Sequence, residues 1–305
     1  MKSPFDGWYE KAGVRTDPRR VIRDEMATGR TLFPEALIPY LHHPLVRELE
    51  PDRRFGLVAR HFYQYMQFTM HFETSVVNRA AARIADGTSG LRLPGAARLD
   101  AYRIYCDEAY HALYSLDIVE QVRDATAIDV PAYDFAPFLG RLDGIGEEVL
   151  PGEPVLVQLL QVVVFETLVT SILKDVPKDP SVIDTIREVV RDHAEDEGRH
   201  HAYFAAFFRE LWQGMSPALR ERAARCLPEL VGRSLTPDLV PVRASLRAAG
   251  LGEAAVREIV ADCHAPGLLR ENVRNSARHT FHLFESVGVM DVPGARDAFT
   301  TAGLL

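Results

Sequence analysis

Two short motifs in the sequence pair a glutamate with a histidine three positions later: Glu108 with His111, and Glu197 with His200. Residues three apart share one face of an α-helix, so both side chains of a pair can point at one centre. Carboxylate and imidazole groups together suit divalent metal ions of hard to borderline character. A single motif of this kind should occur about once by chance in a chain of this size, so its meaning depends on the surrounding sequence.

An internal repeat adds one more carboxylate to each motif. A Phe-Glu-Thr triplet containing Glu73 precedes the first motif, and a second such triplet, containing Glu166, precedes the second. Each half of the repeat therefore offers a glutamate from one helix and a Glu-x-x-His pair from the next. This is the core arrangement of carboxylate-bridged di-iron and di-manganese helix bundles. The pattern predicts a site for two divalent metal ions.

The segment 155–173 supports this interpretation, because Glu166 is its only charged residue. A helix that is apolar on all faces is buried on all faces. A lone ionised carboxylate there costs several kcal/mol unless it is paired, protonated or bound to a metal. A buried salt bridge and a transmembrane span are the alternatives. Gln158 and Gln161 interrupt the segment and no second segment resembles it, which argues against a span.

Further polar residues near the motifs could take part in the site. His193 lies on the same helical stripe as the second motif, so it is either a third imidazole ligand or a core histidine. His201 is rotated by about 100° from the motif histidine and is expected outside the ligand set. Asp107 and Asp196 could accept the second N–H of a ligating histidine, and the alternative is that both are solvated.

The complete donor set resembles that of the p-aminobenzoate N-oxygenases and the related aminochloramphenicol N-oxygenases. These are ferritin-like di-iron enzymes of bacterial natural-product pathways, and a third histidine, in the pattern His-x-x-x-Glu-x-x-His, sets them apart within their superfamily. The resemblance covers roughly residues 51–208 but does not extend residue by residue to the substrate pocket. The positions that match the family's metal ligands are Glu73, Glu108, His111, Glu166, His193, Glu197 and His200.

The resemblance implies a monooxygenase that uses two iron ions and O₂ to oxidise an amine, above all an aryl amine, to a hydroxylamine, nitroso or nitro product in antibiotic biosynthesis. The sequence has no flavin or nicotinamide fingerprint, so electrons are expected from an external reductase or ferredoxin. It leaves open whether the amine is free or carrier-tethered, and whether two copies form a homodimer. The alternative functions are another di-iron oxidase, such as an acyl-carrier-protein desaturase, and a non-enzymatic metal-binding protein of ferritin type.

Composition limits the remaining possibilities. The 305 residues are 47% hydrophobic, which is ample for a sizeable core, and the net charge of −8 argues against nucleic-acid binding. The three cysteines form no C-x-x-C pair, which suits a reducing compartment. The first twenty residues lack the apolar segment of a signal peptide. We therefore expect a cytoplasmic protein that does not enter a membrane.

Proline punctuation and apolar periodicity outline the helices that must position the site. Alternating strand patterns are scarce. We predict an all-α fold, a ferritin-like four-helix bundle with additional N- and C-terminal helices, as one domain over residues 1–305. Its parts are an N-terminal arm (1–50), the four-helix metal-binding core (51–213) and C-terminal helices (214–305). The predicted core helices are 51–85, 96–126, 155–173 and a fourth that is capped by Asp179 and ends near 213, with a short helix at 135–142 in the connector.

Side chains one or two turns from the glutamates and histidines could line a substrate pocket. They are mostly apolar with a few hydroxyls, which suits a flat aromatic ring, although ordinary core packing is the alternative for each. Arg274 and Arg278, on one face of a predicted helix at 266–285, could anchor an acidic substrate or be solvated. The pocket residues are Tyr65, Met66, Thr69, Tyr105, Val162, Val163 and Thr170, with Met70, Ile104 and Val169 nearby.

Overall fold

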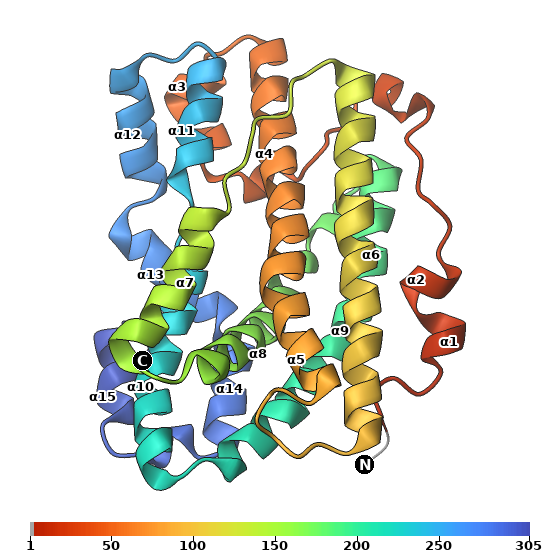
Figure 1. Ribbon diagram of the computed structural model, residues 1–305. Helices are drawn as coiled ribbons and strands as arrows, with labels where there is room; N and C mark the ends of the chain where they lie inside the picture. The colour runs from red at the N-terminus through yellow and green to blue at the C-terminus, as the bar shows by residue number, and fades with distance from the viewer. Residues whose placement is uncertain (1–2) are drawn as a thin grey trace.

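A bundle of long helices forms the centre of the computed structural model, which describes residues 3–305 except for the side chains of residues 169–172 and 269. The described residues contain helices and no β-strand, so the predicted all-α, ferritin-like fold is confirmed. Figure 1 shows α4 and α6 upright beside each other, with α8 and α9 behind them. The bundle helices are α4 (Pro51–Phe72) with α5 (Asn78–Asp86), α6 (Gly95–Thr126), α8 (Pro154–Leu173) and α9 (Asp184–Gly214).

Shorter helices surround the bundle. The N-terminal helices α1 and α2 lie along the outer side of α6, and α2 also contacts α9 (Figure 1). In the C-terminal part, α10 and α14 pack against α8, whereas α11 packs against α4. The arm contains α1 (Trp8–Lys11), α2 (Gly13–Thr16), η1 (Asp24–Thr28), η2 (Glu35–Leu37), η3 (Pro39–His42) and α3 (Pro44–Arg47). The C-terminal part contains α10 (Pro217–Ser234), α11 (Leu239–Ala248), α12 (Glu253–Cys263), α13 (Pro266–Ser276), α14 (Arg278–Ser286), η6 (Val289–Asp291) and α15 (Ala295–Thr301).

A π-helical turn, η4 (Glu73–Val77), interrupts the first bundle helix, which the sequence predicted as continuous. The hydroxyl of Thr74 donates to the backbone carbonyls of Met70 at 2.9 Å and His71 at 3.1 Å. Such bonds compete with the helix's own ladder. A π-turn inserts one extra residue and so changes the direction of the side chains that follow it. The interruption begins at one of the proposed metal ligands.

Three predicted helix boundaries are wrong. Asp179 does not cap the fourth helix, because its carboxylate instead accepts from the amide of Ser181 at 2.9 Å in a local turn, and α9 begins only at residue 184. The connector helix α7 (Ala136–Val149) is longer than predicted. It packs against α8, and Gly146 permits the close approach, because a Cβ there would lie 2.7 Å from a methyl of Val157. The predicted helix at 266–285 is broken into α13 and α14 at Ala277.

Two apolar clusters fill the bundle, one towards each end. Along α6, Ile104 belongs to the first cluster and Ile118 to the second, whereas along α9 the order is reversed, with Val189 in the second and Phe204 in the first. The segments between them carry buried acids and histidines instead of apolar side chains. The polar layer therefore lies between the two clusters, about halfway along the bundle.

The two glutamines of α8 bond to partly buried side chains of α5 and α7. Gln161 accepts from Arg79 of α5 at 2.8 Å and donates to Asp143 of α7 at 3.0 Å, and Gln158 accepts from Arg83 at 2.8 Å. These bonds attach α8 to its neighbours through polar groups inside the protein. Among the described residues, no helix combines the length and the apolar character that crossing a membrane requires.

Candidate metal centre

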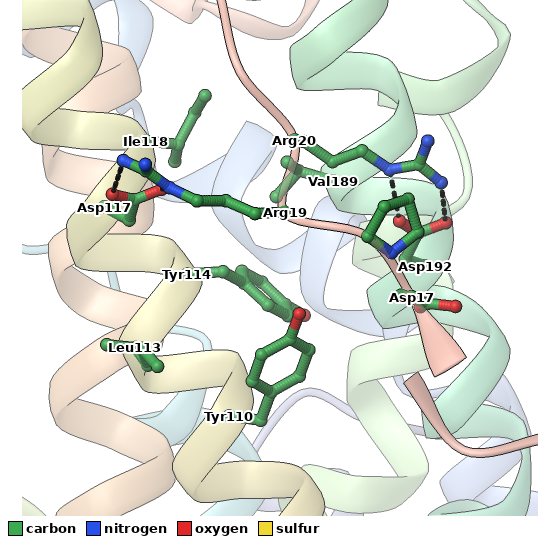
Figure 2. A pocket seen from close by; sticks show the side chains of 11 residues that line it. Asp17, Arg19, Arg20, Tyr110, Leu113, Tyr114, Asp117, Ile118, Val189 and Asp192 are labelled. Atoms are coloured by element: carbon green, nitrogen blue, oxygen red, sulfur yellow. Dashed lines mark hydrogen bonds and ion pairs between the residues drawn. The ribbon is translucent and has the colours of Figure 1, made fainter. Parts of the chain in front are cut away.

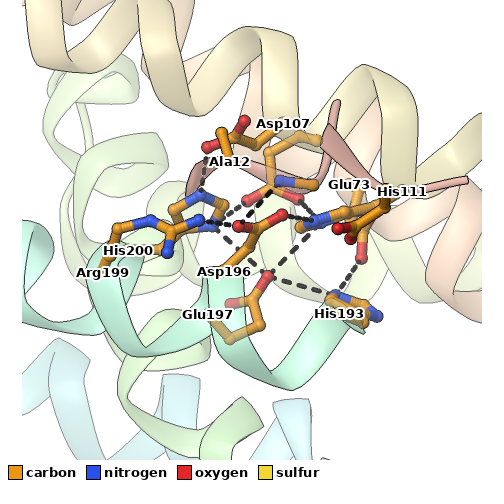
Figure 3. A network of polar contacts seen from close by, with 12 residues as sticks. Ala12, Glu73, Asp107, His111, His193, Asp196, Glu197, Arg199 and His200 are labelled. Atoms are coloured by element: carbon orange, nitrogen blue, oxygen red, sulfur yellow. Dashed lines mark hydrogen bonds and ion pairs between the residues drawn. The ribbon is translucent and has the colours of Figure 1, made fainter. Parts of the chain in front are cut away.

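All the predicted metal ligands converge in the polar layer, and each is buried, with at most 4% of its surface exposed. Their donor atoms form two groups, each within 4.8 Å, and Glu197 belongs to both. Side chains from η4, α6 and α9 surround this centre in Figure 3. The first group is Glu73, His111, His193 and Glu197, and the second is Glu108, Glu166, Glu197 and His200.

The motif histidines face the centre through their Nδ1 atoms. His200 Nδ1 lies 2.8 Å from Glu108 Oε1 and 3.3 Å from Glu197 Oε1. His111 Nδ1 lies 3.1 Å from Glu108 Oε2 and 3.6 Å from Glu197 Oε1. Each of these two glutamates is therefore close to both histidines, which places Glu108 and Glu197 between the two groups of donors.

His193 faces the same centre with its Nε2 atom, which lies 3.0 Å from Glu73 Oε1 and 3.1 Å from Glu197 Oε1. Its ring centroid is 4.2 Å from that of His111. The structure thus brings the third histidine into the donor cluster and not merely into the apolar core. His201 lies outside the cluster, where its Nδ1 contacts the backbone carbonyl of Glu166 at 3.2 Å.

Each motif histidine has an aspartate on the opposite helix as its outer partner. His111 Nε2 lies 3.2 Å from Asp196 Oδ2, and His200 Nε2 lies 3.3 Å from Asp107 Oδ2. Both aspartates are buried, so the solvated alternative is wrong. A carboxylate at Nε2 fixes the proton on that nitrogen. The lone pair of Nδ1 is then free to bind a metal ion at the centre.

The N-terminal arm supplies partners for these aspartates, which the sequence analysis did not predict. The indole Nε1 of Trp8 donates to both carboxylate oxygens of Asp107 at 2.9 Å. The amide of Gly13 donates to Asp196 at 3.4 Å, and Arg199 pairs with the same carboxylate. The contacts of Trp8 and Gly13 join residues far apart in the sequence, and no local pattern in the arm indicates them.

Burial and mutual repulsion affect the four glutamates unequally. Burial, together with the charges of Glu197 and Glu108, raises the pKa of Glu166 well above its usual value. Burial also raises the pKa of Glu73, to about 7. It acts in the same direction on the other two, but the neighbouring histidines outweigh it and lower the pKa of Glu108, and that of Glu197 strongly. Without a cation, the cluster therefore balances its charge with protons.

Several donor atoms of the cluster are buried without a hydrogen-bond partner. They are Glu73 Oε2, Glu166 Oε2 and Glu197 Oε2. Each buried unsatisfied polar atom costs about 1–3 kcal/mol, and more when it is charged. Two divalent cations would satisfy these atoms, and four carboxylates match their total charge. The residues present therefore fit a pair of first-row divalent metal ions.

The predicted pocket residues have different environments. Tyr65 and Thr69 are half-buried on α4, and the hydroxyl of Tyr65 is buried without a partner. Tyr105 is 41% exposed, so it does not line an interior pocket as predicted. Met66, Val162 and Val163 are fully packed in the apolar clusters. The side chains of Thr170 and Val169 lie outside the described residues. Of the further neighbours, Ile104 is buried in the core and Met70 is half-buried.

The contacts of the two C-terminal arginines lie at the C-terminal end of the chain and not at this centre. Both are exposed and line a surface pocket with Leu304, and Arg274 donates to the backbone carbonyl of Gly303 at 2.7 Å. The expectation that Arg274 and Arg278 cap the substrate pocket is therefore not supported, because Arg274 instead holds the C-terminal segment.

A cavity of about 210 Å³ lies between α6, α9 and the arm (Figure 2). Its lining includes Tyr114, whose ring centroid is 5.5 Å from that of His111 and 6.0 Å from that of His193. Arm residues close it, with Arg19 paired to Asp117 and Arg20 paired to Asp192. Sequence reasoning missed Tyr114, although it lies one helical turn from a motif histidine.

Comparison with known proteins agrees with this geometry. A family model described as P-aminobenzoate N-oxygenase AurF matches residues 17–288. The matched range contains all seven clustered donors and both outer aspartates, but it begins after Trp8 and Gly13. No curated protein matches the chain.

Proposed function

We propose that this protein, which belongs to the P-aminobenzoate N-oxygenase AurF family, is a di-iron monooxygenase that uses O₂ to oxidise the nitrogen of an aryl amine. The observation that carries the proposal is the buried cluster of four glutamates and three histidines, with donor atoms left unpaired. The family supports N-oxygenation, and the donor set supports two iron ions.

The geometry suggests how the donors would divide between two ions. Glu73, His111 and His193 would hold one ion, and Glu166 and His200 the other. Glu108 and Glu197 lie close to both groups and would be shared. The iron pair would supply the activation of O₂, chemistry for which protein side chains alone are not suited.

The chain's own residues have three tasks around the iron pair. Four carboxylates neutralise the charge of two divalent ions in a buried site. Asp107 and Asp196 hold the motif histidines in the tautomer that presents Nδ1. The apolar clusters on both sides of the polar layer keep bulk water away from the reacting centre.

His193 favours the N-oxygenase over an acyl-carrier-protein desaturase. The desaturase pattern requires only the Glu and Glu-x-x-His ligands, whereas here a third imidazole lies within 3.1 Å of two cluster carboxylates. A ferritin-type store also has no need of this histidine. We extend the proposal to a role in the biosynthesis of a natural product, with an external reductase or ferredoxin as the electron source.

For the substrate, we propose Tyr65 and Thr69 on α4 as contact residues. The pKa of Tyr65 is raised by burial and by the charges of Glu73 and Glu197, which indicates that its hydroxyl lies towards the cluster. An unpaired buried hydroxyl beside the metal ligands is suited to orient a polar group on an aromatic amine.

The test is anaerobic loading with Fe²⁺, followed by O₂ and a panel of aryl and alkyl amines analysed by mass spectrometry. The N-oxygenase should convert aryl amines to products heavier by oxygen at nitrogen, with ¹⁸O₂ as the source of the label. Oxidation of an acyl chain with no amine product would support a desaturase. Rapid formation of ferric mineral with many iron atoms per chain would support a storage protein.

A further inference from the structure

A continuous series of contacts leads from the protein surface to the metal cluster through the N-terminal arm. Tyr9 is 56% exposed, and its ring packs edge-on against Trp8 at a centroid distance of 5.2 Å. The indole N–H of Trp8 donates to Asp107 at 2.9 Å. Asp107 in turn lies 3.3 Å from Nε2 of His200, whose Nδ1 is inside the cluster.

In the other half of the site, the outer aspartate has no equivalent series among the described residues, and the aromatic contact of His111 runs directly to Tyr114, at 5.5 Å between ring centroids. Asp196 occupies the position that corresponds to Asp107, and it contacts His111 at 3.2 Å. Its partners from outside the cluster, among the described residues, are the amide of Gly13 and the guanidinium of Arg199. Both groups donate hydrogen bonds, but neither belongs to an aromatic side chain that leads towards the surface. Only one of the two outer aspartates is therefore connected to the surface through aromatic side chains.

We propose that Tyr9 and Trp8 form the entry route for the electrons that the enzyme requires. This inference rests on the proposed di-iron function, which consumes electrons that the chain has no cofactor of its own to supply. The donor would be a one-electron carrier protein of the iron–sulfur type that approaches over Tyr9. A hydrogen-bonded path containing conjugated rings couples donor and acceptor better than the same distance through space.

The electron balance is simple. In each passage the carrier would be oxidised by one electron, and one of the two ferric ions, reached through His200, would be reduced to the ferrous state. No bond forms or breaks in Tyr9, Trp8, Asp107 or His200. Two passages reduce the iron pair and prepare it for one molecule of O₂.

Trp8 could instead act only by holding Asp107 in place, and the two roles predict different results. Loss of a purely structural partner disturbs the iron site itself, so reduction changes for every reductant. Loss of a relay affects only a donor too large to enter the protein. Small dithionite-derived anions can reach the site by other routes and do not need the relay.

The experiment measures the reduction of the diferric protein, not turnover. Anaerobic stopped-flow absorption follows the loss of the ferric signal in wild type and in Trp8→Phe, with reduced [2Fe–2S] ferredoxin or with dithionite. We expect reduction by ferredoxin to slow severalfold, because the hydrogen-bonded step from Trp8 to Asp107 is lost. The rates are compared at equal iron content, and the dithionite rate should change less than the ferredoxin rate.

Trp212→Phe is the matched control, because Trp212 is the only other tryptophan and lies on α9, away from the arm. It should be reduced by both reductants at the wild-type rate. The inference is overturned if ferredoxin does not reduce wild type faster than Trp8→Phe, or if dithionite slows by the same factor.

Tyr9→Ala provides a second test that leaves the Trp8–Asp107 bond in place, so it decides the matter if Trp8→Phe fails to fold or to bind iron. It should slow ferredoxin but not dithionite, whereas Tyr102→Ala, at a site 50% exposed on α6, should change neither. Equal ferredoxin rates in Tyr9→Ala and wild type would then reject the relay. A wild-type protein that holds no reducible iron pair would reject the proposed function itself.

Discussion

Replacing Glu166 with glutamine should have different effects with and without metal. In the unfolded chain the carboxyl group has an ordinary pKa of 4.5, whereas burial and the neighbouring carboxylates raise it well above this value in the folded, metal-free protein. Burying the ionised carboxylate therefore destabilises the folded protein increasingly as the pH rises above 4.5. The cost is about 1.4 kcal/mol for each pH unit above 4.5, or up to about 3 kcal/mol at pH 7.

Glutamine has nearly the same shape and needs no proton. Metal-free Glu166→Gln should therefore be more stable than wild type by up to about 3 kcal/mol at pH 7, which corresponds to several degrees in Tm. For an acid with a raised pKa, the penalty is absent below the unfolded value and grows as the pH rises. The gain should accordingly disappear at pH 4.5.

Metal binding should offset this gain. Glutamine cannot supply the charge that a dication at Glu166 would meet, so affinity falls, and a hundredfold loss removes about 2.7 kcal/mol of metal-dependent stabilisation. The assay is thermal unfolding with and without Fe²⁺ under anaerobic conditions. The quantity compared is the rise in Tm that metal causes, which should be smaller in Glu166→Gln than in wild type.

Glu153→Gln is the control, because it removes the same charge at the start of the same helix from a partly exposed side chain. It should leave the metal-dependent rise in Tm unchanged. If Glu166→Gln changes Tm equally with and without metal, the buried carboxylate does not meet a cation, and the reasoning about this helix is wrong.

Further outcomes follow from the same cluster. Reconstituted protein should contain about two iron ions per chain by elemental analysis with magnetic coupling between them, and a single uncoupled ion would contradict the shared carboxylates. His193→Ala should fold and retain iron through the remaining ligands but lose N-oxygenation, and wild-type turnover would place His193 outside the chemistry. Tyr65→Phe should raise KM for aryl amines at unchanged iron content, whereas the exposed control Tyr105→Phe should not. The pKa of Glu73 is raised to about 7 by burial, and that of His111 to about 9, because its bond to Glu108 and the nearby carboxylates outweigh burial. Stability from such raised groups is lost as the pH rises, so the Tm of the metal-free protein should fall between pH 5 and 9 more than that of the loaded protein.

The sequence predicted the donor set because the rules that place it are local. Spacing of three on a helix brings a glutamate and a histidine to one face, and a buried glutamate in an apolar segment requires a cation. The same reasoning did not predict the π-turn at Glu73, because the first bundle helix contains no residue that must break it. It also missed the true start of α9, where the chain first pairs with Thr31 through Ile183 before the helix begins.

The arm was the largest omission. The bond from Trp8 to Asp107 spans 99 positions, and the bond from Gly13 to Asp196 spans 183. No periodicity connects such residues, and the sequence indicates the arm only as residues 1–50 before the bundle. Contacts of this length depend on the assembled bundle, which first creates the buried aspartates that the arm then covers.

Each motif histidine pairs with the aspartate of the other motif, and the internal repeat in the sequence does not show this crossed pairing. Within each motif the aspartate precedes the histidine by four positions, so a local reading joins Asp107 to His111 and Asp196 to His200. The structure instead joins each histidine to the aspartate of the other helix, at 3.2 and 3.3 Å. Each half of the repeat thereby orients the imidazole of the other half. Because α6 and α9 must be in register for either histidine to present Nδ1, neither Glu-x-x-His motif forms a complete site alone, and the two halves of the bundle must form the metal centre together.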